Sequence, residues 1–583
     1  MYKGMTCASG SPAFKDLIAK DDSFVAQQLR AAGAVCLGLT NTPPMMASGM
    51  HRGYYGRAES PYNLEYLTAA FSSGSSNGSG TSTAASFAAF SLGSETVSSG
   101  RSPASNNALV AYTPSRTVIS PRWCWPLYPT CDVLVPHTRT VEDMLTILDV
   151  LTAPDADQAG EFWREQTYVK VPEVSRPRSH LDLKAGAQNA LCGKRIAIPK
   201  MYIGGKDPEA KPTIVSEEVV SLWRRARKDL ESLGATVTES DFPLVTNYES
   251  GPGNNVQGFK PDWNAKERGE LVAYMWDDFL KANGDPNCAS LVDVDGTKMF
   301  PNRPDGYLPD LHMEVKNFMN YPRLVELAKQ RGGKSIWDLD GIAEALPALE
   351  AQRKRDLEDW MEVNGYDLVV FPANGDVGKA DLETNEKSAE DALQNGVKYS
   401  NGNRAIRHMG VPTVSVTMGL MDDKKMPVNL TFAGKHGQDS DLLRYAYAFE
   451  QQTKRRVAPP LTPALKSDDI ALDEKKEPIT DRAVSPKVTL MSYKVPGEKI
   501  KVELSAVGSS LEAWVNGKPM SGMLKKQDNS TFWTLEADFV PFEPPKPPYG
   551  GYGEHVGKVM VTLLVRGYSG IVGGKMLLID PEA

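Results

Sequence analysis

The pattern of apolar and polar residues has a helical period in the first part of the chain and a period of two in the last part. This change divides the sequence into two regions. Up to about residue 460, helical patterns are followed by short apolar runs. The pattern at 22–33 predicts a helix that stops at Gly33, and the run 34–40 then predicts a buried strand. The same combination of a helical pattern and short apolar runs recurs at 194–244, 344–373 and 412–453. In the first of these, Ser216 is placed to cap the helix. The combination predicts an α/β fold, a mixed β-sheet flanked by helices.

Beyond residue 486 the period changes to two. The stretches that alternate in this way are 487–493, 499–507, 511–520, 531–539 and 558–568. Asn516 and Gly517 form a strong hairpin-turn signal within the third of them. The stretch 466–486 is charged and poor in aromatic residues, which is typical of a linker. The predicted organisation is a domain at 1–465, a linker at 466–486 and a C-terminal β-sandwich at 487–583.

One part of the first domain departs from this order. Residues 247–345 are rich in Trp, Asn, Pro and Gly and show less regular patterning. We interpret them as an insertion over the sheet. It could act as a substrate lid, or it could be a surface excursion without a role.

The overall composition narrows the class of protein. Of the 583 residues, 41% are hydrophobic and 24% are charged, as in ordinary globular proteins, and the net charge is −8. The acidic balance argues against a nucleic-acid partner, and no apolar run reaches the roughly 18 residues that span a bilayer, so no membrane partner is expected. Six Cys without a CxxC pair favour reduced thiols and a cytoplasmic location. No metal motif stands out, and we expect no cofactor.

The stretch 71–90, "FSSGSSNGSGTSTAASFAAF", is built almost entirely from small residues and resembles a linker. It runs directly into an Ala-rich piece, however, which favours a helix. A Gly/Ser loop that enters a helix presents unpaired backbone N–H groups, which suit an anion or a developing oxyanion. "GSSNG" at 74–78 also matches the nucleophile elbow, with Ser76 as nucleophile, but the elbow needs a strand before it and none is evident.

Several ordered motifs carry a resemblance to a known family. "LRAAGAVCLGLTN" (29–41), "GSETVSSGRSPAS" (93–105), "ALVAYTPSRTVIS" (108–120) and "CDVLVPHTRTVEDM" (131–144) follow one another in the order of the amidase signature family. The resemblance extends from residue 1 to about 460. It implies a mixed sheet flanked by helices and hydrolysis of a carboxamide C–N bond through a Ser–Ser–Lys triad.

The resemblance also implies the residues of the site. Ser99 falls on the family's nucleophile, and Ser75 falls on its bridging serine, which follows a cis peptide bond in that family. The backbone amides that would form the oxyanion hole belong to Thr96, Val97, Ser98 and Ser99. Ser76 and Arg101 would support the loop. Val97 and Ser98 replace two glycines of the family pattern, which would strain the loop if either needed a positive φ.

The catalytic lysine of the family has no counterpart in this sequence. The motif "YKGMTCASGS" matches family sequence that lies just after that lysine, so the lysine is expected a few residues before Met1. Lys3 comes too late in the motif and is expected to be solvated. Without a base the chain as written would be a poor catalyst. His51 and His137 are weaker alternatives as the base, and Trp123 and Trp125 could line an acyl pocket or pack in the core.

Three functions remain open from the sequence. The first is hydrolysis of a small-molecule amide. The second is a non-catalytic or truncated family member whose β-module binds a ligand. The third is an amidotransferase subunit that passes ammonia to a partner acting on tRNA, and the acidic charge and the β-module do not favour it. Self-association into a homo-oligomer is also left open.

Overall fold

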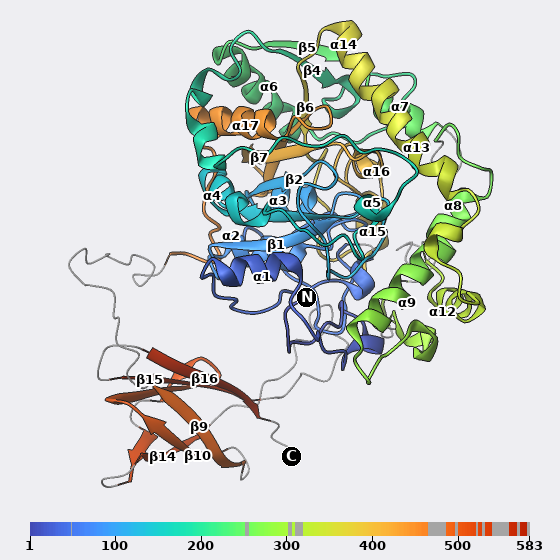
Figure 1. The fold of residues 1–583 in the computed structure, drawn as a ribbon. Coiled ribbons are helices and arrows are strands. Elements are labelled where there is room, and N and C mark those ends of the chain that lie inside the picture. The colour runs from blue at the N-terminus through green and yellow to red at the C-terminus, as the bar shows by residue number, and fades with distance from the viewer. Residues whose placement is uncertain are drawn as a thin grey trace. The chain divides into compact units, whose positions relative to one another are not determined.

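The chain folds into two compact units, shown as a computed structural model in Figure 1. Its structure is described for residues 1–47, 49–250, 256–300, 303, 306–308, 319–464, 486–495, 499–520, 523–527, 531–538, 559–567 and 572–579. The units are Met1–Pro463 and Ala464–Ala583. Each has a hydrophobic core of its own, as an independently folding domain requires.

The first unit is built on an eight-stranded sheet with the order β1-β3-β2-β7-β8-β6-β4-β5. Its strands are β1 (Phe90–Glu95), β2 (Val110–Thr113), β3 (Val133–Thr138), β4 (Arg195–Pro199), β5 (Thr236–Ser240), β6 (Leu368–Pro372), β7 (Thr413–Leu420) and β8 (Pro427–Ala433). β4 pairs in parallel with β5 and β6, and the other neighbours are antiparallel. The predicted mixed sheet is therefore confirmed.

Helices flank this sheet, as predicted (Figure 1). They are α1 (Phe24–Ala31), α2 (Asn77–Ala84), α3 (Arg101–Asn106), α4 (Val141–Leu151), α5 (Phe162–Glu165), α6 (Glu217–Ser232), α7 (Pro243–Glu249), α13 (Ile342–Arg353), α14 (Trp360–Asn364), α15 (Glu386–Ala392), α16 (Asn403–His408) and α17 (Asp439–Thr453). Ser216 caps α6 as expected, since its side chain accepts a hydrogen bond from the backbone N–H of Val219. Amphipathic helices such as α6 bury one face on the sheet and so complete the core.

The predicted strand at 34–40 is wrong. The helix before it is present as α1, which ends at Ala31 and is followed by Gly33 with φ of 86°, but residues 34–40 are not in a strand. Val35 is 81% exposed and Leu37 is 73% exposed. A strand needs a neighbour to complete its hydrogen bonds, and no described segment pairs with this run.

The helix after the Gly/Ser loop lies earlier than its composition predicts. α2 covers Asn77–Ala84, while the Ala-rich piece that follows is not helical and contains Ser86 with φ of 61°. Glycine is needed within α2 because a Cβ on Gly78 would lie 2.5 Å from the backbone of Asn41, and one on Gly80 would lie 3.0 Å from Pro103. Close packing of this kind outweighs the low helix propensity of Gly.

The region 247–345 is more helical than predicted. Its described part contains α8 (Trp263–Lys266), α9 (Val272–Asn283) and α12 (Tyr321–Gln330). Trp276 of α9 is buried and stacks on Tyr321 of α12, with ring centroids 6.4 Å apart. Aromatic packing of this kind holds the region together despite its irregular composition.

The second unit contains two four-stranded antiparallel sheets that share one core, as predicted for a β-sandwich. The strands are β9 (Lys487–Lys494), β10 (Lys499–Val507), β11 (Ser510–Val515), β12 (Lys518–Pro519), β13 (Leu524–Lys526), β14 (Phe532–Asp538), β15 (Val559–Arg566) and β16 (Val572–Ile579). Asn516 and Gly517, with φ of 48° and 78°, form the predicted turn between β11 and β12. Of the predicted linker, residues 466–485 lie outside the described residues.

We expect a chain that ends at residue 464 to fold and to keep its amidase unit intact. The reason is that the cores of the two units do not share residues. Circular dichroism and thermal melting of the shortened chain beside the full chain would check this. Insoluble or unfolded shortened protein would contradict it.

Candidate active site

Ser99, the expected nucleophile, lies at the start of α3 against the loop that precedes α2. Its side chain is 5% exposed, and its Oγ lies 3.3 Å from the Oγ of Ser73. Ser73 also accepts a hydrogen bond of 2.9 Å from the backbone N–H of Ser98, and Ser98 Oγ donates to the carbonyl of Ser73. The structure therefore joins the Gly/Ser loop to the loop 96–99, called the Ser99 loop below, by paired hydroxyl and backbone contacts.

The other serines of the loop have different neighbours. Ser76 Oγ donates to the carbonyl of Ser94 and accepts from its backbone N–H, both at 3.0 Å, so this side chain is bound to β1 rather than to Ser99. Ser75 is buried, but no hydrogen bond joins its hydroxyl to Ser99 in the described part of the chain. The hydroxyl that contacts Ser99 is therefore that of Ser73, which the family spacing did not single out.

A buried ion pair fixes the turn that carries Ser99. The carboxylate of Glu95 accepts hydrogen bonds from the backbone N–H groups of Gly100 and Arg101 and from Nε of Arg101, at 3.0, 2.8 and 2.9 Å. Both side chains are fully buried. Arg101 also donates to the carbonyls of Val97, Asn401 and Asn403. Arg101 thus links the loop to residues 401–403, and the sequence did not single out Glu95 as its partner.

The sequence does hold a signal for this pair. Glu95 and Arg101 flank Ser99 within one short motif, and a carboxylate and a guanidinium so close to each other in a buried segment have to be paired. The pair holds the amides of Gly100 and Arg101 and the carbonyl of Val97 in place. The loop geometry around Ser99 therefore depends on two charges that do not contact Ser99 themselves.

We expect Glu95→Gln to destabilise the amidase unit by about 3–5 kcal/mol, because it leaves the buried charge of Arg101 without its partner. Urea unfolding of the variant and of the unchanged chain would measure this. Glu231→Gln is a matched control, because Glu231 is in an exposed pair with Arg227 and exposed pairs contribute about 0–1 kcal/mol. Equal losses in the two variants would contradict the bracing role.

The four amides assigned to the oxyanion hole are not equivalent. The N–H of Ser98 donates to Ser73 Oγ and is therefore engaged. Thr96 is held through its side chain, whose Oγ1 donates to Asp132 at 2.6 Å. Asp132 also accepts from the backbone N–H groups of Leu127 and Tyr128, and burial raises its pKa to about 6. Asp132 thus connects the Ser99 loop to the segment before β3.

The alternative bases, His137 and His51, have contacts with other groups than the Ser99 hydroxyl in the described part of the chain. His137 is buried and its Nε2 lies 2.8 Å from the carbonyl of Gly100, to which it donates. Burial lowers the pKa of His137 to about 4, so the ring supports the loop in its neutral form. His51 packs between Phe71 and Phe300. Both rings therefore contribute to the packing and hydrogen bonding around the loop.

Lys3 is exposed and forms an ion pair of 3.0 Å with Asp21, as expected for a solvated lysine. This pairing holds its ammonium on Asp21 rather than on a serine of the site. The described segments bring together no group of three or more His, Cys, Asp or Glu side chains that could hold a metal ion. None of the helices in those segments combines the length and the apolar character of a membrane span.

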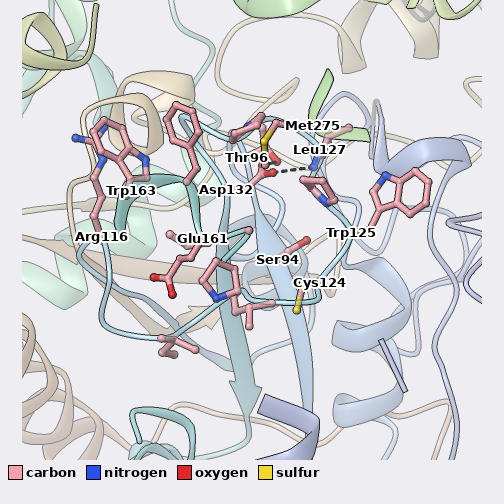
Figure 2. Close-up of a pocket in the computed structure, with 18 of the residues that line it drawn as sticks. Ser94, Thr96, Arg116, Cys124, Trp125, Leu127, Asp132, Glu161, Trp163 and Met275 are labelled. Atoms are coloured by element: carbon pink, nitrogen blue, oxygen red, sulfur yellow. Dashed lines mark hydrogen bonds between the residues drawn. The ribbon is translucent and has the colours of Figure 1, made fainter. Parts of the chain in front are cut away.

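A cavity lies beside the Ser99 loop (Figure 2). It has a volume of about 70 Å³ and is walled by apolar side chains that include Trp125, Trp163 and Met275. Ser94, Thr96 and Asp132 reach it from the side of the loop, whereas Ser99 is not among the residues that line it. Trp125 lines this cavity and also packs edge-on against Phe14, Trp276 and Phe279, whereas Trp123 is not part of the lining.

The comparisons with known proteins agree with this architecture. The Amidase family model matches residues 1–252. A glutamyl-tRNA(Gln) amidotransferase subunit from Symbiobacterium thermophilum is 30% identical over 465 residues, which cover 78% of this chain and 82% of that protein. The corresponding protein of Exiguobacterium sibiricum is 27% identical over 467 residues, covering 79% of this chain and 83% of the other.

Solved structures share the fold. An amidase family protein from Bacillus anthracis superposes with a TM-score of 0.55 at 21% identity, covering 78% of this chain and 75% of that one. Peptide amidase from Stenotrophomonas maltophilia superposes with a TM-score of 0.54 at 21% identity, covering 78% and 81%. On the motifs, the mixed sheet and these relatives together, the chain belongs to the amidase signature family of enzymes that act on carboxamide C–N bonds.

Proposed function

We propose that the protein hydrolyses the C–N bond of a carboxamide through an acyl-enzyme on Ser99. The observation that carries this proposal is the position of the Ser99 hydroxyl. It is buried, 3.3 Å from a second serine hydroxyl, on a turn braced by Glu95 and Arg101. A serine is a weak nucleophile until a neighbouring group accepts its proton, and a hydroxyl relay can carry that proton to a base.

The reaction would run in two steps. Ser99 Oγ attacks the carbonyl carbon while its proton leaves through the relay, and backbone N–H groups of the 96–99 loop stabilise the oxyanion. The C–N bond then breaks as the leaving amine takes up the proton, which gives an acyl-enzyme and a free amine or ammonia. A water molecule attacks the ester, the acid is released and the proton returns to Ser99.

The bridging hydroxyl is proposed to be Ser75, by its spacing from Ser99. Ser73 is the competing assignment, since its hydroxyl contacts Ser99 directly. Ser73→Ala and Ser75→Ala separate the two, with Ser76→Ala as the control because Ser76 is bound to β1. The bridging serine is the one whose removal lowers kcat while substrate binding is retained.

The base is proposed to be a lysine on a strand, as the family resemblance implies. Val35 and Leu37 form an exposed apolar run that such a strand could cover if it were added to the chain.

Release of ammonia from simple primary amides tests the hydrolase function. Robust release that is lost in Ser99→Ala would support it. A chain that binds amides but never releases ammonia, with or without added upstream sequence, would favour the non-catalytic alternative instead.

A second candidate is a role as one subunit of an amidotransferase, which the names of the curated relatives favour. Such a protein works with a partner chain. Co-purification of a second protein in constant ratio, together with ammonia transfer rather than release, would support this candidate.

A further inference from the structure

Glu267 is a fully buried carboxylate that the proposed reaction does not use. It begins the π turn η6 (Glu267–Leu271), and turns of this kind are rare and frequently mark functional sites. Its Oε1 accepts hydrogen bonds from Oγ1 of Thr130 at 2.6 Å and from Nε2 of His408 at 2.8 Å. Its Oε2 accepts from the guanidinium of Arg404 at 3.1 Å. Glu267 therefore ties together two segments that are distant in the sequence.

The cluster around Glu267 holds one negative and one positive charge. Burial lowers the pKa of His408 to about 4, so its ring is neutral. Its Nε2–H donates to Glu267, and its Nδ1 accepts from the hydroxyl of Tyr248 at 2.8 Å. Arg404 carries the positive charge, and its guanidinium carbon lies 4.5 Å from the ring centroid of Tyr128. Buried charges need partners of this kind, so removal of the carboxylate charge would disturb the whole cluster.

One of the two segments, 127–132, leads to the Ser99 loop from its N-terminal side. Thr130 is bound to Glu267, and two residues later Asp132 accepts a hydrogen bond of 2.6 Å from Oγ1 of Thr96. Asp132 also accepts from two backbone N–H groups of the same segment, which closes it into a turn. The turn thus transmits the position of Glu267 to Thr96, the first residue of the loop.

The other segment is the helix α16, which begins next to the site. Arg404 and His408 both belong to α16, so their bonds to Glu267 fix this helix. The helix follows Gly402, which has φ of 85°, and a Cβ at this glycine would lie 2.5 Å from Ile406 of the helix. Because the start of α16 fits so tightly, the residues just before the helix have to follow its position.

These residues before α16, together with its first residue, contact the site directly. The backbone N–H of Ser400 donates to Oγ of Ser98 at 3.0 Å. The carbonyls of Asn401 and Asn403 accept from Arg101 at 2.5 and 3.3 Å. A shift of α16 would therefore move acceptors and donors on the C-terminal side of the Ser99 loop as well.

We propose that Glu267 is a positioning residue for Ser99. It holds the Ser99 loop from both sides, through the segment 127–132 and through α16, and it acts without touching the substrate. This inference rests on the proposed hydrolase function and adds a residue on which the rate of that reaction depends.

The rate at which a fluorophosphonate labels Ser99 in the full chain tests the proposal. Measured over a range of probe concentrations, it separates the maximal rate at saturating probe from the concentration that gives half of this rate. We expect Glu267→Gln to lower the maximal rate at least about tenfold, because a displacement of about 1 Å can cost about 10²-fold. The half-saturating concentration should stay unchanged, since Glu267 does not contact the probe.

Asp277→Asn is the matched control. Asp277 is also a fully buried carboxylate, on the neighbouring helix α9, and it binds Ser290, the backbone N–H of Leu291 and Lys281. In the described part of the chain none of these three is hydrogen-bonded to the Ser99 loop. Asp277→Asn should therefore lose stability in urea, as Glu267→Gln does, and keep the maximal rate of labelling.

An unchanged maximal rate in folded Glu267→Gln, or an equal loss of rate in Asp277→Asn, would overturn the proposal. If Glu267→Gln does not fold, Thr130→Val removes one of the hydrogen bonds to Glu267 while the side chain keeps its size. This variant should still lower the maximal rate several-fold, and an unchanged rate would overturn the proposal. Failure of the hydrolase function is seen separately, because Ser99 would then be labelled at these rates without any release of ammonia from amides.

Discussion

Replacing Ser99 by Ala is expected to lower kcat/KM for amide hydrolysis by at least about 10³-fold. The members of such a catalytic unit act together, so loss of the nucleophile removes most of the contribution of the others. The substitution removes one oxygen from a buried contact with Ser73, so the fold should be retained. Ammonia release under saturating and limiting amide would measure kcat and KM separately.

Ser76→Ala is the control for this experiment. Ser76 belongs to the alternative elbow motif, but its hydroxyl is bound to the backbone of Ser94 on β1. Its loss should affect stability more than chemistry. If Ser76→Ala abolished activity and Ser99→Ala did not, the elbow interpretation would replace the present one.

The second large effect concerns the base. We expect the 583 residues alone to be a poor catalyst, and the same chain with a lysine-bearing strand of the family pattern fused before Met1 to be about 10²–10⁴-fold faster, the usual contribution of general acid–base catalysis. The added residues should also form a strand that covers Val35 and Leu37. The two versions would be compared in the same amide assay.

Lys3→Ala serves as the control in the shorter chain. Lys3 is exposed and paired with Asp21, so its removal should leave the rate unchanged. Equal and robust activity of the two versions, surviving Lys3→Ala, would contradict the account and would require a different base.

The parts of the fold that could be predicted are those that local pattern determines. The unit β4–α6–β5 has an apolar run at β4, then an amphipathic helix with a serine cap, and then the β-branched stretch of β5. Each of these signals lies within the element that it predicts. The strands β9, β10 and β11 alternate in burial along their length, and the Asn516–Gly517 turn sets the register of its hairpin.

The parts that could not be predicted depend on contacts between distant segments. The run 34–40 has the composition of a buried strand, yet the described structure offers it no pairing partner. α2 forms in a stretch of low helix propensity because Gly80 fits against Pro103. Such tertiary contacts override the local helix or strand propensity, and they do not produce a periodic pattern in the sequence.

The candidate site also has parts that the sequence could predict and parts that it could not. Motif spacing leads to the proposals for Ser99 as nucleophile and Arg101 as a supporting residue, because both lie within one short segment. It could not choose among the clustered serines, and only the fold shows that Ser73, rather than Ser75 or Ser76, contacts Ser99. The cavity could not be predicted from the sequence either, because its walls come from segments as far apart as Met46 and Met275.

Mapping a covalent adduct would show which serine is the nucleophile. The chain would be treated with a fluorophosphonate that reacts with activated serine hydroxyls, and the modified peptide would be located by tandem mass spectrometry. The account predicts a single major adduct on Ser99, absent from Ser99→Ala. An adduct on Ser76 or another serine, or labelling that is unchanged in Ser99→Ala, would contradict it.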